Sequence, residues 1–153
     1  MADSRPPPAD EARHEGAAAR ERLVAAFDPG RNVGFALVDV RGQALRLAVL
    51  RREEVATVAL PSEAVVVVGA GTGRRDVLAA LRQRGLEPRL VDERGTSLEG
   101  LRLWRRHAAA RGLTRLLPAA LRTPARPIDD HAAWAIALRY LAQRRADPEQ
   151  GAG

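Results

Sequence analysis

The stretch Val65-Val66-Val67-Val68-Gly69-Ala70-Gly71-Thr72-Gly73 indicates the fold class more clearly than any other part of the chain. Four consecutive valines leave the segment without a polar face, so both sides of this strand must be covered, as in the central strands of parallel sheets. The glycines end the strand, and apolar residues at helical spacing then predict a helix over residues 74–84. A further strand is expected at residues 87–91, which completes a βαβ crossover.

Three short apolar runs upstream of this unit predict an antiparallel meander. Residues 23–27 and 34–40 are apolar, and the turn residues Asp28-Pro29-Gly30 follow the first run. Arg41-Gly42 can turn the chain back into a third strand near residues 44–50.

Helices are predicted over residues 51–60, from Thr96 or Ser97 to about Arg111, and over residues 128–143. Residues 112–127 hold three prolines and are expected to be irregular. The order β-β-β-α-β-α-β-α-α predicts an α/β fold with a mixed sheet of about five strands, in which an antiparallel three-strand meander precedes parallel βαβ units. Helices are expected on both faces of this sheet.

The length of 153 residues, with 46% apolar and 29% charged residues, suits one globular domain. We expect a disordered or weakly helical tail at residues 1–21, a folded domain at 22–144 and a flexible tail at 145–153. The absence of cysteine excludes disulfides, zinc–thiolate sites and thiol chemistry. No apolar run reaches the roughly 18 residues of a membrane span, and no secretory signal is recognisable, so we expect a cytoplasmic protein with no membrane partner.

Positive charge is concentrated in one part of the chain. The net charge is +6 and all 25 basic residues are arginine. Residues 94–126 hold eight arginines against a single acidic residue, Glu99, whereas residues 1–22 hold four arginines against five acidic residues. Guanidinium groups match phosphate geometry, so this stretch favours a polyanion such as nucleic acid. The alternative is a solvated helix face.

Acidic residues occur at three element ends. Asp28 ends the first predicted strand, Asp92 and Glu93 end the last one, and Asp129 and Asp130 begin the final helix. The carboxyl edge of an α/β sheet is where sites assemble, and carboxylates that converge there need cations to offset their repulsion. Mg²⁺ or Mn²⁺ prefers oxygen ligands, and two such ions roughly 4 Å apart suit phosphodiester hydrolysis.

Each acidic position also has an ordinary structural explanation. Asp28 fits a turn former, and Asp92-Glu93 fits a cap for the following helix. Asp129 and Asp130 fit a helix N-terminus, whose dipole favours negative charge. Only the joint order of the three clusters favours a functional interpretation.

Three motifs resemble the RuvC/YqgF-type nucleases, which are resolvase-like members of the RNase H fold superfamily. They are Phe27-Asp28-Pro29-Gly30 with Gly34-Phe35-Ala36, Val91-Asp92-Glu93-Arg94-Gly95-Thr96-Ser97, and Pro127-Ile128-Asp129-Asp130-His131-Ala132-Ala133. The resemblance spans about residues 22–144 and indicates a divergent branch. The loop from Asp28 to Gly34 is one residue shorter than in the family, and Gly69–Gly73 stands where central members carry a Gly-Leu-Pro loop.

The resemblance implies which residues hold the metals. Asp28, Glu93 and Asp129 take the positions of the catalytic metal ligands, and Asp92 and Asp130 are their supporting neighbours. Asp129 is preferred over Asp130 from the motif alone, because periodicity cannot decide between them. Arg94 and Thr96 look like phosphate-contacting or supporting groups, and further nucleic-acid contacts are expected from other polar residues. These are Arg31, Thr72, Arg105, Arg106, Arg115, Arg122 and Arg126.

The implied function is a metal-dependent nuclease that hydrolyses structured DNA or RNA through a metal-activated water. Holliday-junction resolution and precursor ribosomal RNA processing are both associated with these motifs, and the first requires a homodimer. The alternative is a non-catalytic nucleic-acid-binding module on the same fold. An actin-like kinase is excluded by length.

Aromatic and histidine side chains add little to the functional reading. Aromatic residues are only 3% of the chain, which disfavours recognition by base stacking. Trp104 and Trp134 are expected in the core. His131 is expected at the surface, as a lone histidine at a helix start usually is. The alternative is that it helps to activate a water molecule.

Overall fold

The computed structural model describes residues 23–92, 99, 100, 102, 103, 105, 106 and 129–146. Five strands form one sheet in the order β3-β2-β1-β4-β5. β1 is antiparallel to β2, and β2 to β3, whereas β1, β4 and β5 run parallel. This confirms the predicted mixed sheet. The strands are β1 (Leu23–Asp28), β2 (Val33–Asp39), β3 (Ala44–Leu50), β4 (Ala64–Gly69) and β5 (Arg89–Val91).

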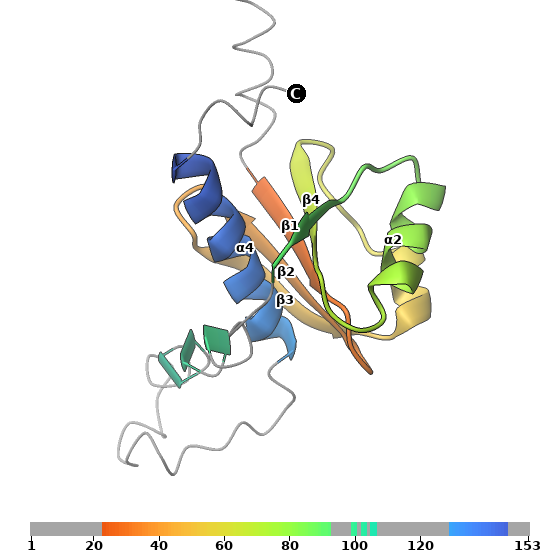
Figure 1. Cartoon of the computed structure of the whole chain (residues 1–153), viewed down its shortest axis with the longest axis horizontal. Helices are drawn as coiled ribbons and strands as arrows, with labels where there is room; N and C mark the ends of the chain where they lie inside the picture. The colour runs from red at the N-terminus through yellow and green to blue at the C-terminus, as the bar shows by residue number, and fades with distance from the viewer. Residues whose placement is uncertain (1–22, 93–98, 101, 104, 107–128, 147–153) are drawn as a thin grey trace, which may run out of the picture.

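Helices cover both faces of the sheet, as predicted (Figure 1). The long helix α4 (Asp129–Ala146) crosses one face, and the 3₁₀-helix η1 (Arg52–Ala56) and α2 (Arg74–Gln83) cover the other. The described residues between 99 and 106 are helical and lie beside the start of α4 (Figure 1). Within the described residues, no helix combines the length and apolar character that a membrane span needs.

The helix predicted over residues 51–60 is wrong in extent. Only Arg52–Ala56 is helical, as a single 3₁₀ segment. Val55, Thr57 and Val58 are β-branched, which lowers helix propensity, and Pro61 soon follows. The predicted ends of α2, β5 and α4 are within three residues of those observed.

Several predicted segments lie outside the described residues. They are the tails at 1–21 and 147–153, the irregular segment 112–127, and most of the helix predicted up to residue 111.

Alternation along the strands builds two cores. Ala25 and Phe27 of β1 face η1 and α2, whereas Val24 and Ala26 face α4. The valine run divides in the same way, because Val66 and Val68 join the first core and Val67 joins the second. β4 is therefore covered on both sides, as four consecutive valines require.

Helix α4 is attached to the turn between β2 and β3. The indole N–H of Trp134 donates to the carbonyl of Gly42 at 2.9 Å, and Trp134 is partly buried against the second core. Arg145 donates to the carbonyl of Val40 at 3.1 Å. Both contacts attach α4 to the end of the sheet opposite to the one that its first residue, Asp129, approaches. The side chain of Trp104 lies outside the described residues.

Candidate active site

The carboxyl edge of the parallel strands brings two of the acidic segments to the same end of the sheet. Phe27 of β1 pairs with Val68 of β4, and Val68 pairs with Leu90 of β5. Asp28 and Val91, one residue further along, therefore lie at the same level. Asp92 follows directly and is exposed.

Asp28 belongs to the sheet face that α4 covers. It is the last residue of β1 and lies two positions after Ala26 and four after Val24, which both contact α4. Alternate residues of a strand point to the same face of the sheet. Asp28 is only partly buried, because the strand ends there and Pro29-Gly30 turns the chain away.

Gly34 brings the start of α4 to Asp28. In the antiparallel pair of β1 and β2, Gly34 lies directly opposite Asp28. A Cβ atom on Gly34 would overlap the backbone carbonyl of Asp129 and would lie 3.1 Å from the nitrogen of Asp130. The first turn of α4 can approach the strand this closely only because residue 34 has no side chain. Asp28 and Asp129 therefore flank one glycine.

The two adjacent aspartates of α4 have different environments. Asp130 is 0% exposed, and its Oδ1 accepts a hydrogen bond from the backbone N–H of His131 at 2.8 Å and lies 2.7 Å from Nδ1 of the same residue. Asp129 is only partly buried. The surroundings of Asp129 thus leave its carboxyl group more accessible than that of Asp130.

The surface position predicted for His131 is wrong. This residue is 0% exposed, and its ring lies 5.9 Å from that of Trp134. The start of α4 is covered by the sheet on one side and by Gly100 on another, where an added Cβ would lie 2.7 Å from the nitrogen of Ala132. No periodicity in the sequence indicates that Gly100 covers this side of α4.

Burial raises the pKa of the Asp129 carboxyl group above its ordinary value, and the neighbouring charge of Asp130 adds to the shift. The ionised form of Asp129 is therefore disfavoured in the protein alone. A cation placed beside it would favour the ionised form.

Glu93 lies outside the described residues, but Asp92 and Glu99, which are described on either side of it, both contact Arg139 of α4. The guanidinium of Arg139 donates from Nη1 to the carbonyl of Asp92 at 2.8 Å, and its Nη2 lies 3.5 Å from Oε1 of Glu99. Gly100 follows and contacts the first turns of α4. Sequence reasoning missed Arg139, because no local pattern links it to residues 92 and 99.

The described part of the chain contains no group of three His, Asp or Glu side chains that could hold a metal ion. This leaves the predicted triad of Asp28, Glu93 and Asp129 as a prediction, since one member is outside the described ranges.

The predicted nucleic-acid contacts are placed only in part. Arg31 and Thr72 are exposed in the loops after β1 and β4, at the same edge of the sheet as Asp28. Arg105 is partly buried and Arg106 exposed on the helical stretch beside α4. The others lie outside the described residues, namely Arg94, Thr96, Arg115, Arg122 and Arg126.

Arg52, also missed from sequence, joins the loops at this edge. Its guanidinium donates to Asp76 of α2 at 2.8 Å and to the carbonyl of Gly30 at 3.4 Å. The β1–β2 loop and the start of α2 are thereby linked beside Asp28. The three residues are more than twenty positions apart, so no motif connects them.

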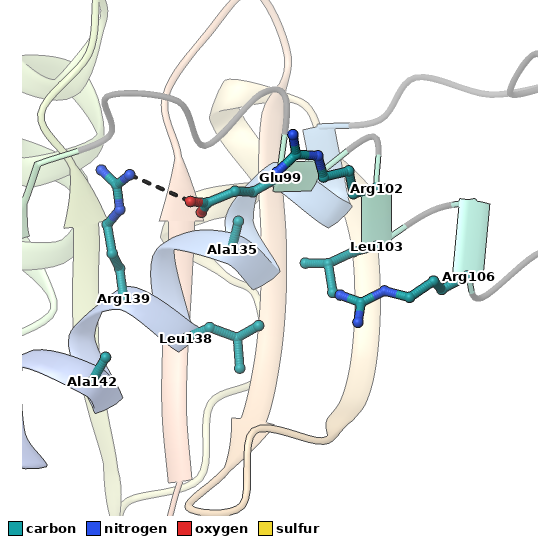
Figure 2. A pocket seen from close by; sticks show the side chains of 8 residues that line it. All are labelled: Glu99, Arg102, Leu103, Arg106, Ala135, Leu138, Arg139 and Ala142. Atoms are coloured by element: carbon teal, nitrogen blue, oxygen red, sulfur yellow. Dashed lines mark ion pairs between the residues drawn. The ribbon is translucent and has the colours of Figure 1, made fainter. Parts of the chain in front are cut away.

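A groove of about 370 Å³ runs between α4 and the helical stretch 99–106 (Figure 2). Leu103 and Leu138 form part of its floor, and Arg102, Arg106 and Arg139 stand at its rim. Arg139 reaches towards Glu99 across one end (Figure 2).

A mixed sheet of order β3-β2-β1-β4-β5, with α4 across one face and α2 on the other, defines an RNase H-like fold. Among solved structures, RuvC from T. thermophilus in complex with a Holliday junction substrate is similar, with a TM-score of 0.54 and 20% identity over 83% of this chain and 98% of that chain. No protein-family model and no curated protein matches the sequence. The likeness confirms the RNase H-like fold, whereas membership of the superfamily and of a divergent RuvC/YqgF branch stays a prediction.

Proposed function

We propose that the chain is a metal-dependent nuclease that hydrolyses phosphodiester bonds in branched or structured nucleic acid. The observation that carries the proposal is the contact between Gly34 and the backbone of Asp129, because Gly34 is also the register partner of Asp28. Carboxylates that come close repel one another, so an acidic corner of this kind is expected to hold a cation.

The donor set at this corner fits Mg²⁺ or Mn²⁺. Asp28 and Asp129 offer carboxylate oxygens, which hard divalent cations prefer, and Glu93 is the third proposed ligand. The raised pKa of Asp129 also fits, because a bound cation would offset both the burial and the charge of Asp130. When bound, a pair of such ions would supply a water of lowered pKa and positive charge at the leaving oxygen.

The residues that precede Glu93 support its inclusion. Arg89 and Val91 of β5 both contact α4, since Arg89 donates to the Tyr140 hydroxyl at 2.6 Å and Val91 joins the second core. Glu93 follows Val91 by two positions in the sequence. Asp92, which follows Val91 directly, and the buried Asp130 are proposed as supporting residues.

The chain's own residues would hold the strand to be cut. Arg31 and Thr72 stand at the edge of the sheet, and Arg105 and Arg106 belong to the helical stretch 99–106, where Arg106 lines the groove along α4. Arginines in these two places would bind phosphates that flank the scissile one. Binding of this kind is sequence-independent and weakens with salt.

The preferred substrate is branched DNA, cut by a homodimer in the cytoplasm. The support is the likeness to RuvC, which was solved with a Holliday junction. Two symmetry-related sites would cut opposing strands of such a junction. The proposed domain, residues 22–144, includes all three acidic clusters.

The test compares a four-way DNA junction, single-stranded DNA and a structured precursor RNA, each with the full chain and Mn²⁺. We expect cleavage of the junction, complete loss of cleavage in Asp28→Asn and in Asp129→Asn, and retained binding in both. Glu63→Gln, in an exposed residue at the opposite end of the sheet, is the control and should cleave normally.

Binding without cleavage of any substrate would instead support the non-catalytic module. Preferential cleavage of the precursor RNA would replace the DNA substrate with RNA and leave the chemistry intact. Undiminished cleavage by Asp28→Asn would overturn the site.

A further inference from the structure

We infer that three exposed arginines, at the contact between the β1–β2 loop and the start of α2, form one phosphate-binding surface that holds a nucleic-acid backbone beside the end of β1. They are Arg31, Arg74 and Arg75, called here the three-arginine surface. Arg52 is the positioning residue that keeps the two parts of this surface together. The inference rests on the proposed function for the class of ligand, and binding at this surface needs no metal.

The β1–β2 loop meets the start of α2 through two glycines. A Cβ atom on Gly73 would lie 3.8 Å from the carbonyl oxygen of Gly30. Arg31 follows Gly30 directly, and Arg74 follows Gly73, with Arg75 next to it on α2. Arginines that are distant in the chain therefore start from adjacent points of the surface.

Arg52 of η1 joins the loop to the helix. Its Nη1 donates to Oδ2 of Asp76 in α2 at 2.8 Å, and its Nη2 donates to the carbonyl oxygen of Gly30 at 3.4 Å. The same Nη2 would lie 3.3 Å from a Cβ atom on Gly73. The guanidinium fork is planar and rigid, so these contacts hold the loop and the helix at a fixed spacing. The two helices η1 and α2 lie side by side on this face of the sheet (Figure 1).

The three-arginine surface carries charge that no acidic side chain offsets. Asp76, the only acidic residue of α2, is paired with Arg52. Within the described part of the chain, none of the three arginines forms an ion pair. Arg74 donates from Nη1 to the carbonyl of Ala70 at 2.8 Å, a contact that leaves its charge in place. Like charges held close repel one another, and a phosphate backbone removes this cost because guanidinium groups match phosphate geometry.

The three-arginine surface is close to the proposed cleavage position. Arg31 is three residues after Asp28, so their Cα atoms are at most about 11 Å apart. The carboxyl ends of the parallel strands β1 and β4 lie at one edge of the sheet, and α2 starts from this edge. A backbone whose phosphates contact the three arginines would therefore pass the end of β1, where Asp28 stands.

Ordinary solvation of surface arginines is the competing explanation. All 25 basic residues of the chain are arginine, and exposed ones also occur elsewhere, for example Arg41 and Arg82. The two explanations differ in whether location matters. Solvated arginines act only through net charge, so the loss of any exposed pair has the same effect on nucleic-acid binding. A binding surface makes the pair beside the end of β1 more important than a pair elsewhere.

The test measures binding of the full chain without metal, over about 50 to 200 mM salt, to a four-way DNA junction or a structured RNA, whichever the wild type binds more tightly. For Arg31→Gln combined with Arg75→Gln we expect the affinity to fall by about 10-fold or more. The slope against log salt should fall by about 1.4 to 1.8, because each phosphate contact contributes roughly 0.7 to 0.9.

The matched control combines Arg41→Gln with Arg82→Gln and removes the same charge. Arg41 lies in the turn between β2 and β3, and Arg82 lies near the end of α2, so both are at the opposite end of the sheet. This control should keep the slope of the wild type and lose less than about twofold in affinity.

Cross-linking locates the bound strand independently of charge. The chain has no cysteine, so one introduced cysteine carries a photo-cross-linker at a single known position. Asn32→Cys places it beside Arg31, and Gln43→Cys places it in the turn between β2 and β3; both residues are exposed. We expect several-fold more cross-linking to nucleic acid from position 32 than from position 43.

Arg52→Met tests the positioning role. We expect it to lower the affinity by about threefold in the wild-type background and to have no further effect when Arg31 and Arg75 are already replaced, because a positioning residue acts through them. Arg52→Lys keeps the charge without the fork and should also bind more weakly than the wild type. A loss that adds in full would mean that Arg52 binds phosphate itself, which would overturn its positioning role.

Equal affinity and slope in the two double variants, or equal cross-linking from positions 32 and 43, would overturn the three-arginine surface. If the wild type binds and cleaves in that case, only this surface fails. If the wild type binds neither the junction nor the RNA, the proposed function itself fails.

Discussion

Gly34 and Asp129 meet backbone to backbone, although they are almost a hundred residues apart in the chain. Gly34 is also the register partner of Asp28. A residue without a side chain thus lies between the two carboxylates on which the proposed chemistry depends.

Substitution of Gly34 by alanine tests the corner directly. The added methyl group overlaps the carbonyl of Asp129, so α4 must shift, and the free energy of unfolding should fall by about 1–3 kcal/mol. Mn²⁺ affinity and cleavage should fall as well. Gly85→Ala is the control, because Gly85 has φ of 77° and no atom near its Cβ position, so it loses stability through strain alone. Equal Mn²⁺ affinity in the two variants would contradict the prediction.

The raised pKa of Asp129 predicts a pH-dependent effect on stability. Folded protein holds this proton more tightly than the unfolded chain, so its contribution to stability is present at acidic pH and is lost as pH rises through the folded-state pKa. Asp129→Asn should therefore be more stable than the wild type at pH 7, and the difference should shrink on acidification towards about pH 3. Thermal unfolding across this range is the measurement.

Mn²⁺ should stabilise the folded protein through the carboxylate of Asp129. The cation should raise the unfolding temperature of the wild type at pH 7 and leave Asp129→Asn unchanged, because only the carboxylate gains from it. Glu63→Gln controls for the loss of one negative charge.

For the pH-dependent effect on stability, a difference in stability between wild type and Asp129→Asn that does not vary with pH would argue against the raised pKa of Asp129.

Arg84 should contribute to stability by joining η1 to α2. Its guanidinium donates to the carbonyls of Val55 and Val58 at 2.9 and 2.8 Å, and so attaches η1 to the end of α2. Arg84→Met should lower the free energy of unfolding by about 2–3 kcal/mol, since two carbonyls lose a charged donor. Urea unfolding measures this, with Arg82→Met as the control in an exposed residue near the same helix end. A loss below 0.5 kcal/mol, about the size of an ordinary surface change, would contradict it.

Arginines of the helical stretch 99–106 should determine the salt dependence of nucleic-acid binding. Arg102 and Arg106 are both exposed, and reversing both to glutamate should weaken junction binding and reduce the slope against log salt by about two, because roughly one counterion is released for each phosphate contact. The matched control reverses Arg41 and Arg82, which are exposed elsewhere. Identical slopes for the two double variants would rule out this surface.

Local patterns predicted most of the elements. The valine run required a strand covered on both faces, and Val66 and Val67 indeed belong to different cores. Gly85 directly follows the helix predicted over residues 74–84, and it has the positive φ that is typical of the residue after a helix C-cap. The helix predicted over residues 51–60 is wrong in extent, because the β-branched residues that follow Glu54 lower the helix propensity before Pro61.

The candidate site was predictable only as an order of acidic residues along the chain. The pattern could not distinguish Asp129 from Asp130, because both neighbouring faces of the helix are apolar. In the structure, Asp130 is closed off with His131, whereas Asp129 keeps access to solvent. Arg139 and Arg52 were missed because each joins segments that are distant in sequence.

The amino-acid sequence alone determined the strands, the turns and the position of each carboxylate at an element end, because period, turn chemistry and apolar runs act over a few residues. Only the tertiary structure decided which carboxylate of α4 is buried, which arginine contacts both Asp92 and Glu99, and that Asp28 and Asp129 share one corner. Those outcomes depend on how closely a helix can approach a strand. That approach is set by the missing side chain of Gly34, together with the packing of the whole sheet face.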